Sequence, residues 1–310
     1  MSYDKPPAEE RRLVTQRIDK RQYGARTTVR LPSDRALGFR DGVGLSLSNG
    51  ALAVIEPDGA ADDARALRYS VELTGYRTAA DAESAGKRLA FSLLWSSVSF
   101  GMPLQLEYAT VEPCRVFDRT TGGGVFGRAR LEQVMSFDQV AAELNDVFDS
   151  GYVCDDRTLL SLELFCAAPM ETSQRTRFIS TVSALEPLAL QKPLSTAVDK
   201  FVDDCVASLA QAEVDEPMVT SLRGRLLQLK RDSVRQALLR LLRKHFVDRA
   251  DLVVQLDEAY GRRSDLIHEG RIDPDIDLPR ETQTIRETMR ELYARMLSRP
   301  LKRAAQLKPR

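Results

Sequence analysis

The hydrophobic periodicity of this chain changes near residue 150. Before that point, short apolar and β-branched runs are separated by Gly, Pro, Asn and Asp, a pattern typical of strands joined by turns. After Gly151, leucines recur every three or four residues in long runs, which is typical of helices. A chain of 310 residues is also longer than one core usually serves. We therefore predict an α+β protein of two domains: a mixed, β-rich α+β domain over residues 1–150 and an all-α helical bundle over residues 151–310.

The first half combines strands with one long helix. Ser48-Asn49-Gly50 predicts a hairpin turn, because Asn-Gly tolerates the positive φ angles of tight turns. Thr78 followed by Asp81 predicts the start of a helix over 78–100, which Gly101 ends. We expect strands at 27–31, 43–47, 51–55, 68–73, 104–108 and 114–117, and a shorter helix at 137–148.

The second half contains no convincing strand. Its apolar residues follow the helical period, with the arginines largely on other faces. This pattern predicts a helical bundle. We expect helices at 158–167, 173–190, 194–212, 217–246, 250–268 and 281–298.

Charge is balanced over the chain but unevenly distributed along it. The 45 Lys and Arg residues equal the 45 Asp and Glu residues, which argues against a general nucleic-acid coat protein. Basic residues nevertheless gather at 11–40, 223–249 and 299–310. These clusters fit either solvated helix faces or local contacts with a nucleic-acid backbone.

Familiar signatures of other functional classes are absent from the sequence. No Walker A, HExxH, zinc-type cysteine spacing or GxSxG elbow occurs, so we expect neither a metal nor a cofactor. The GGGVFG stretch at 122–127 fits a glycine-rich fingerprint formally, but it lacks a βαβ context and we interpret it as a loop. The four cysteines form no CxxC pair and are expected to be reduced. The N-terminus lacks the apolar region of a signal peptide, and the apolar stretch at 89–102 is too short to span a bilayer, so a cytoplasmic location is expected.

Only two histidines could perform acid–base chemistry near neutral pH. His245 ends a basic helical stretch, where a cation would favour the helix C-terminus, and a structural role is expected. His268 ends the predicted helix 250–268 just before Gly270. By position alone it could equally be a residue that caps the helix.

The residues around His268 carry a family resemblance. Arg263, four intervening residues and His268, followed by Glu269-Gly270, resemble the RxxxxH motif of the HEPN superfamily. The stretch RRSDLIHEG after Tyr260, with Ala-Leu-Glu at 184–186 upstream, is similar to the ApeA-like HEPN branch over residues 158–298. One residue departs from the motif: Ser264 follows the arginine, where strongly active members often carry Asn, Asp or His.

The resemblance implies a HEPN-like bundle that acts as a metal-independent endoribonuclease, commonly a toxin or an anti-phage defence effector. It also implies a homodimer that does not associate with a membrane. Arg263 would bind the scissile phosphate and His268 would transfer protons. We expect supporting roles for Glu186, Tyr260, Ser264 and Asp265. The candidates for contacts with RNA are Arg262, Arg271, Arg235 and Arg243. The first domain would sense or regulate, and an antitoxin or defence partner could control the protein.

Helix geometry limits this interpretation. Five residues at 100° each place Arg263 and His268 about 140° apart around an ideal helix. A twofold axis that pairs this helix in two chains would supply two of each residue to one cleft. The sequence leaves two alternatives: a non-catalytic HEPN module that mediates dimerisation or binds a partner protein or nucleotide, and an unrelated helical adaptor in which the motif is a coincidence.

Overall fold

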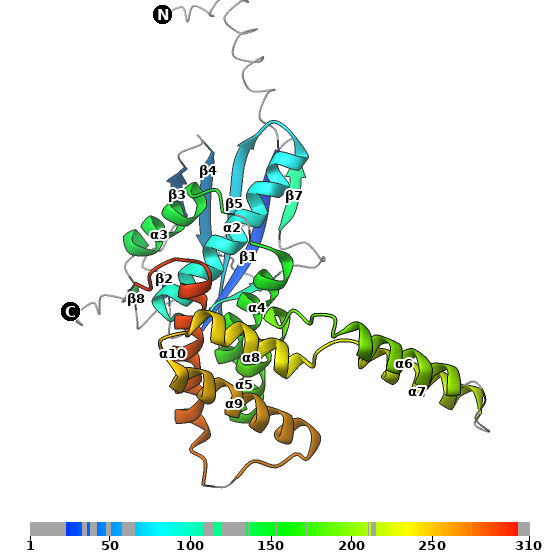
Figure 1. Ribbon diagram of the computed structural model, residues 1–310. Helices are drawn as coiled ribbons and strands as arrows, with labels where there is room; N and C mark the ends of the chain where they lie inside the picture. Colours follow the sequence, from blue (N-terminus) through cyan, green and yellow to red (C-terminus); the bar gives the residue numbers. More distant parts are fainter. Residues whose placement is uncertain are drawn as a thin grey trace, which may run out of the picture. The chain divides into compact units, whose positions relative to one another are not determined.

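The computed structural model of this chain (Figure 1) shows an antiparallel sheet with helices in its first part, followed by a helical second part, so the predicted α+β class is confirmed. Two units are distinguished, Met1–Thr172 together with Pro300–Arg310, and Ser173–Arg299. The structure describes residues 23–32, 36–37, 42–47, 51–57, 66–107, 114–118, 134–135, 137–152, 154–171, 173–209, 211, 215–273 and 275–302.

The first unit is built on an antiparallel sheet with the order β3-β4-β5-β1-β6, in which β7 also pairs with β1. The long strands β1 and β5 form its centre, in register from Gly24 opposite Thr74 to Pro32 opposite Ala66. The strands at the predicted positions are β1 (Tyr23–Pro32), β3 (Val43–Ser46), β4 (Leu52–Pro57), β5 (Ala66–Tyr76), β6 (Gln105–Glu107) and β7 (Arg115–Asp118). β3 and β4 pair as the expected hairpin, although residues 48–50 of its turn lie outside the described residues.

A two-stranded parallel ladder accompanies this sheet. It joins β2 (Ala36–Leu37) to β8 (Val134–Met135). Two-residue strands carry too little periodicity to be recognised in a sequence, and neither was predicted.

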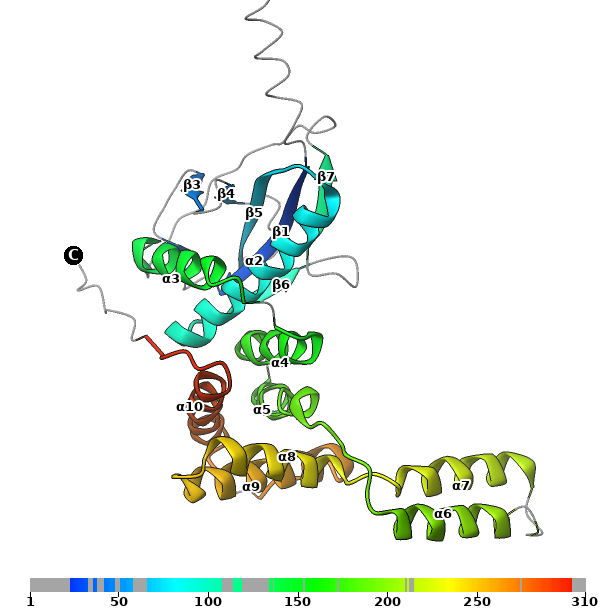
Figure 2. The ribbon, with the colours of Figure 1, turned by 45° about the horizontal axis from the view of Figure 1, so that its top comes forward.

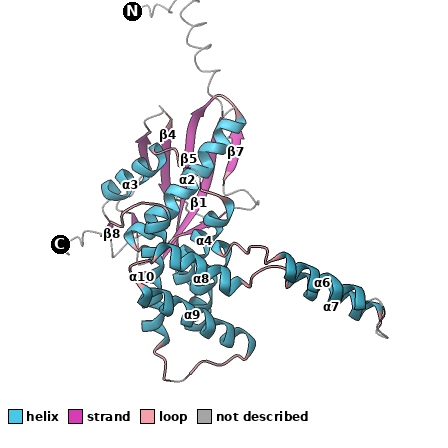
Figure 3. Cartoon of the chain, in the orientation of Figure 1, coloured by secondary structure: helices cyan, strands magenta, loops and turns pink. Residues whose placement is uncertain are grey.

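One face of the sheet is covered by the long helix α2 (Ala79–Phe100), as Figures 1 and 3 show. Thr78 caps it by accepting a hydrogen bond from the Asp81 N–H, and Gly101 ends it at φ 66°. The helix approaches the sheet closely at Gly86, where an added Cβ would lie 2.2 Å from Cys114 Sγ and 2.9 Å from Ala25 Cβ. Glycine is therefore required at this contact.

Two further helices complete the first unit. α3 (Phe137–Asp149) packs on α2, and Trp95 Nε1 donates a 2.8 Å hydrogen bond to Glu143 Oε1 between them. α4 (Asp156–Ala167) also packs on α2 and is followed by the short helix η2 (Ala168–Met170). The boundary between the units therefore falls after Thr172, later than the expected residue 150. The difference arises because α4 has the helical periodicity of the second half but buries its apolar face in the first unit.

The second unit is helical. Its buried centre lies among α5, α8, α9 and α10, with large side chains from each of them, and α6 and α7 pair with each other. The elements are α5 (Gln174–Ser183), η3 (Glu186–Leu188), α6 (Thr196–Leu209), α7 (Glu216–Gln228), α8 (Val234–His245), α9 (Ala250–His268) and α10 (Leu278–Met296). None of the helices in the described part of the chain has both the length and the apolar character needed to cross a membrane.

The single helix predicted at 217–246 is wrong, because the chain breaks there into α7 and α8. Ser233 begins the second helix with a capping box, in which its side chain accepts from Gln236 N–H and Gln236 bonds back to the Ser233 N–H. The leucine spacing continues across the break, and this continuity conceals it. The predicted helix 173–190 likewise ends early, at Ser183, before Pro187 enters η3.

The break between α7 and α8 is tied to the segment before α6. Pro193 and Arg231 form an isolated antiparallel bridge, and Leu194 N–H donates to the Lys230 carbonyl. Buried Asp232 accepts from the Lys192 N–H at 2.6 Å and forms an ion pair with Arg240. We call this set of contacts the Asp232 clasp. It fixes both ends of the α6–α7 hairpin to the start of α8.

Candidate functional site

Arg263 lies in the second half of α9, and its guanidinium group is held by residues of the α5–η3 segment. Nη1 lies 2.9 Å from Glu186 Oε1, and Nε donates a 3.1 Å hydrogen bond to Ser183 Oγ. The side chain is 18% exposed. One carboxylate and one hydroxyl group thus fix the orientation of a partly buried arginine.

Tyr260 joins the same contacts from one turn earlier on α9. Its hydroxyl group donates a 3.2 Å hydrogen bond to Glu186 Oε1, the oxygen that also meets Arg263. Burial raises the pKa of Tyr260 above its usual value, and the Glu186 carboxylate adds to that shift by its charge and its hydrogen bond. We call Ser183, Glu186, Tyr260 and Arg263 the Glu186 cluster.

The local sequence explains how Glu186 reaches α9. Helix α5 ends at Ser183, and the fully buried Ala184 and Leu185 hold the following backbone in the core. Pro187 then stands in the first turn of η3, where its missing N–H causes no loss. The chain therefore turns so that Glu186 and Ser183, three residues apart, both face α9.

His268 is separate from this cluster. It is the last residue of α9 and is exposed. The Glu269 N–H caps the helix by donating a 2.8 Å hydrogen bond to the Asp265 carbonyl, and the following Gly270 has a φ of 68°. Within the described residues, the His268 side chain has no hydrogen bond or ion pair. Five residues of helix also give a rise of about 7.5 Å between Arg263 and His268. Within one chain, no hydrogen bond or ion pair joins His268 to Arg263.

The two remaining support candidates flank the motif without entering the cluster. Ser264 is half-buried, and Asp265 is exposed and contributes its backbone carbonyl to the helix end. Their predicted roles stay predictions.

The four arginines predicted to contact RNA fall into two groups. Arg262 pairs with Glu281 and with Glu258, and Arg235 makes a bidentate pair with Asp257 at 2.6 and 2.9 Å. Their charges are already compensated within the chain. Arg243 and Arg271 are exposed, and no described residue forms an ion pair with either of them.

The second histidine has a different environment. His245 is half-buried at the end of α8, and burial lowers its pKa below the usual value, with Lys244 adding to the shift. Its carbonyl accepts a 3.0 Å hydrogen bond from Arg295. Because the lowered pKa favours the neutral ring at neutral pH, His245 itself does not supply a cation at this helix end, where Arg243 and Lys244 also lie.

Ser183 was missed as a site residue. Its position three residues before Glu186 was the available signal, but an arginine partner across two helices cannot be read from such spacing. The acidic partners of Arg235 and Arg262 were missed for the same reason, since Asp257 and Glu281 lie on different elements from their arginines.

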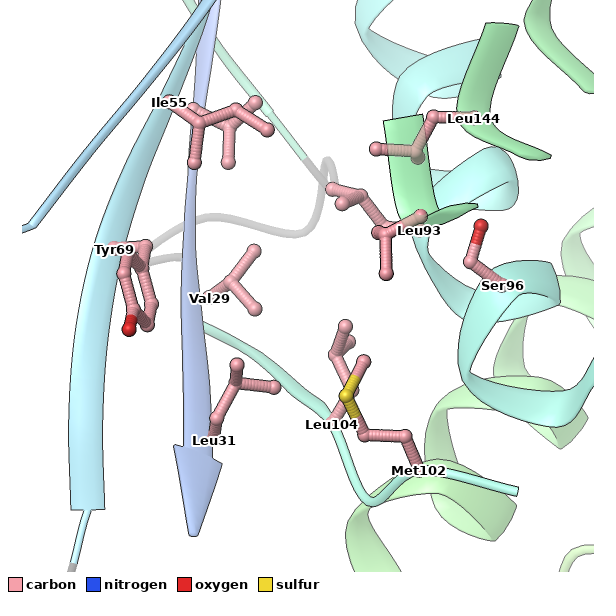
Figure 4. Close-up of a pocket in the computed structure, with 11 residues that line it drawn as sticks. Val29, Leu31, Ile55, Tyr69, Leu93, Ser96, Met102, Leu104 and Leu144 are labelled. Carbon is pink, nitrogen blue, oxygen red and sulfur yellow. The ribbon is translucent and has the colours of Figure 1, made fainter. Parts of the chain in front are cut away.

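The first unit contains a small apolar cavity between the sheet and the helices, shown in Figure 4. Strand residues such as Val29 and Ile55 face Leu93 of α2 and Leu144 of α3 across it. Its volume of about 20 Å³ has room for about one water molecule. This cavity is a packing defect of the core, too small to hold a metabolite.

The cysteines and acidic residues of the described chain offer no reactive or metal-binding group. Burial, followed by the charge of Asp155, raises the pKa of Cys154 to about 12, which makes its thiol a poor nucleophile at neutral pH. Among the residues described, no three His, Cys, Asp or Glu side chains are grouped closely enough to hold a metal ion.

No family model matches this chain, and comparisons with curated proteins and with solved structures likewise found no match.

Proposed function

We propose that this protein is a HEPN-type, metal-independent endoribonuclease whose active cleft forms between the α9 helices of two chains. The observation that carries the proposal is the Glu186 cluster, which holds the arginine of the Arg-x4-His motif in a fixed orientation. Residues outside the motif, Glu186 and Ser183, contact Arg263 at 2.9 and 3.1 Å. A phosphate-binding arginine benefits from such preorganisation because less freedom is lost on binding.

The remaining donors of Arg263 suit a phosphate group. Glu186 pairs with Nη1 and Ser183 accepts a hydrogen bond from Nε, whereas Nη2 forms no hydrogen bond or ion pair with a described residue. A guanidinium group has five N–H donors in a planar fork, so a phosphate oxygen can bind at Nη2 without displacing Glu186. The Glu186 carboxylate then orients the arginine and does not compete for its free edge.

The reaction would proceed by internal attack on RNA. One His268, in its neutral form, takes the proton from the 2′-hydroxyl group as that oxygen attacks the phosphorus. Arg263 stabilises the additional negative charge on the phosphate oxygens. The bond to the 5′-oxygen breaks, and a second, protonated His268 from the other chain donates a proton to that oxygen. The products are a 2′,3′-cyclic phosphate and a 5′-hydroxyl end.

The role in the cell follows from the same proposal. A ribonuclease of this type would act in the cytoplasm as a toxin or as an effector of antiviral defence, under the control of an antitoxin or another partner. The first unit, residues 1–172, would sense the trigger or regulate the second.

A second function is favoured by the burial of Arg263. Its charge is already paired with Glu186 and its side chain is mostly covered, as in a structural ion pair. In this alternative the second unit is a non-catalytic HEPN module for dimerisation or for binding a partner protein or nucleotide.

An RNA cleavage assay separates the two functions. Wild-type protein should cut an unstructured labelled RNA in the presence of EDTA, and Arg263→Ala should reduce the rate at least about a hundredfold, as for the loss of a group that stabilises transition-state charge. Arg280→Ala removes an exposed arginine of α10 that is outside the motif and the predicted RNA contacts; it is the control and should cut nearly as wild type does. Equal cleavage by wild type and Arg263→Ala would remove Arg263 from the mechanism.

A further inference from the structure

The α6–α7 hairpin is a pair of helices with little core of its own. Val202 is the only buried residue described in the two helices; the other apolar residues between them, such as Leu209, Leu222 and Leu226, are only half-buried. α6 and α7 lie side by side in Figures 1 and 2 and extend away from the other helices of the second unit. Two-helix pairs rarely hide enough apolar surface to be stable without a further element.

Large apolar side chains of the hairpin are exposed to solvent. Phe201 on α6 is 66% exposed, Met218 on α7 is 49% exposed, and Leu229 at the end of α7 is 55% exposed. Single exposed apolar residues are ordinary, but several on one short hairpin mark an interaction surface.

Helix geometry places these residues on one face of the hairpin. On α7, the exposed Met218 and Leu229 are eleven residues apart, which is about three turns, so they lie on one side of the helix. On α6, Phe201 is one turn before Cys205. The half-buried residues of each helix face the other helix. Because both helices are right-handed, this orientation places Phe201 on the same side of the hairpin as Met218 and Leu229. We call this side the Phe201 face.

The two helices carry opposite charge. α6 has three aspartates and one lysine, and α7 has two arginines and one glutamate. Asp203 is used within the chain, where it meets Lys230 at 2.7 Å. Asp204 and Arg225 are exposed, and neither forms an ion pair with any residue in the described ranges.

We propose that the Phe201 face binds the same face of a second copy of this chain, so that the two hairpins form a four-helix bundle. A twofold axis along the helices would set each α6 on the partner's α7, so that acidic and basic helices meet. An axis across the helices would instead set α6 on α6 and bring like charges together. The charge distribution therefore selects the first arrangement. The apolar residues supply the core of the interface, and Asp204 and Arg225 form its charged rim.

The Asp232 clasp makes the hairpin suitable for this role. It anchors both ends of the hairpin to α8 through Asp232, Arg240 and the Leu194–Lys230 hydrogen bond. A surface held in place before binding loses less conformational freedom when it associates. This interface lies on α6 and α7, whereas the proposed ribonuclease cleft uses α9, so the inference goes beyond the proposed function and does not depend on RNA cleavage.

The test is the oligomeric state of the full chain by sedimentation velocity over a range of concentrations. Wild type should associate beyond the monomer, and Phe201→Asp or Met218→Asp should weaken this association at least about tenfold, since both place a charge in an apolar interface. Val247→Asp is the matched control, because Val247 is 85% exposed but lies outside the hairpin, and it should dimerise as wild type does. A wild type that is monomeric throughout, or dimers that persist unchanged in both hairpin variants, would overturn the inference.

A charge swap tests the arrangement of the two hairpins. Asp204→Arg and Arg225→Asp should each weaken the dimer, and the double variant should regain affinity because the opposite charges meet again in exchanged places. A double variant weaker than both single variants would contradict the pairing of α6 with α7. Failure of RNA cleavage with an intact hairpin dimer would count against the proposed function alone.

Discussion

Arg263 Nη1 lies 2.9 Å from Glu186 Oε1, and through this contact the first residue of the Arg-x4-His motif is tied to the turn that follows α5. The same carboxylate oxygen accepts the hydroxyl group of Tyr260. Glu186 therefore contacts two side chains of α9 at once. Its removal should affect both the position of Arg263 and the packing of α9 on α5.

Glu186→Ala tests this positioning role. The change should lower the rate of RNA cleavage about tenfold by releasing Arg263, while the free energy of unfolding falls by only about 1 kcal/mol, because the ion pair is partly exposed. Glu186→Gln keeps an acceptor for Tyr260 and should recover part of the rate. The measurements are initial cleavage rates and urea unfolding.

Glu287→Gln is the control for that experiment. It removes a carboxylate that pairs with Arg290 at 2.9 Å on α10, and it should leave cleavage unchanged. If Glu186→Ala cleaves at the wild-type rate, Glu186 has no part in positioning Arg263.

Tyr260 predicts a stability change at alkaline pH. Its pKa in the folded protein is raised, first by burial and then by Glu186, above the usual tyrosine value of 10.0, so the folded state favours the protonated phenol. The hydrogen bond to Glu186 therefore stabilises the fold fully below pH 10 and is lost as the pH rises through the raised pKa. Tyr260→Phe should cost about 1 kcal/mol at pH 8. Its deficit relative to wild type should narrow above pH 10 in denaturant titrations, and a constant deficit would contradict this account.

The contact of Lys302 with Glu143 predicts a role for the segment after α10. Glu143 is only 2% exposed, accepts a hydrogen bond from Trp95 and forms an ion pair with Lys302. Lys302→Met leaves the buried carboxylate without its cation and should lower the free energy of unfolding by about 2 kcal/mol. Trp95 is the only tryptophan of the chain, so its fluorescence reports this unfolding directly.

A second substitution should rescue that loss. Glu143→Gln retains the acceptor for Trp95 but carries no charge, so the double variant with Lys302→Met should be more stable than Lys302→Met alone. Equal stability of the two variants would show that Lys302 does not compensate the Glu143 charge.

The Asp232 clasp predicts sensitivity to acid. The pKa of Asp232 is lowered from the usual aspartate value of 3.8, chiefly by the hydrogen bond from Arg240 and further by the Lys192 N–H. Its stabilising contribution is therefore present above pH 3.8 and is lost as the pH falls through the lowered pKa. Asp232→Asn should open the clasp already at pH 7 and speed amide exchange at Lys192 and Leu194 about tenfold. Unchanged exchange at both amides would show that the carboxylate charge is not needed.

The strands and helices with strong local signals could be predicted from the sequence. Thr78 and Gly101 mark the ends of α2, and the prediction of α9 at 250–268 is confirmed to the residue. The break before Ser233 was not predicted because the leucine period runs through it, whereas the capping box depends on side-chain geometry. The placement of α4 in the first unit depends on which surface its apolar face meets, and periodicity carries no information about that partner.

The candidate site was predictable only in part. Glu186 was expected to orient Arg263 or His268, and the structure places it on Arg263. The partners of Arg262 and Arg235 depend on how α8, α9 and α10 pack, so their compensation could not be seen in the sequence. His268 has no hydrogen bond or ion pair with any described residue, Arg263 included, as expected for two residues about 140° apart on an ideal helix.

The most direct test of the proposed function compares the two histidines of the chain in one RNA cleavage assay in the presence of EDTA, with analysis of the product ends. Wild type and His245→Ala should both cut RNA and leave 2′,3′-cyclic phosphate ends, because His245 lies outside the motif. His268→Ala should remain folded and lose cleavage by at least about a hundredfold, the range expected for loss of a general acid–base group. Cleavage by His268→Ala at the wild-type rate, or the absence of cyclic phosphate ends from the wild-type products, would contradict the proposed mechanism.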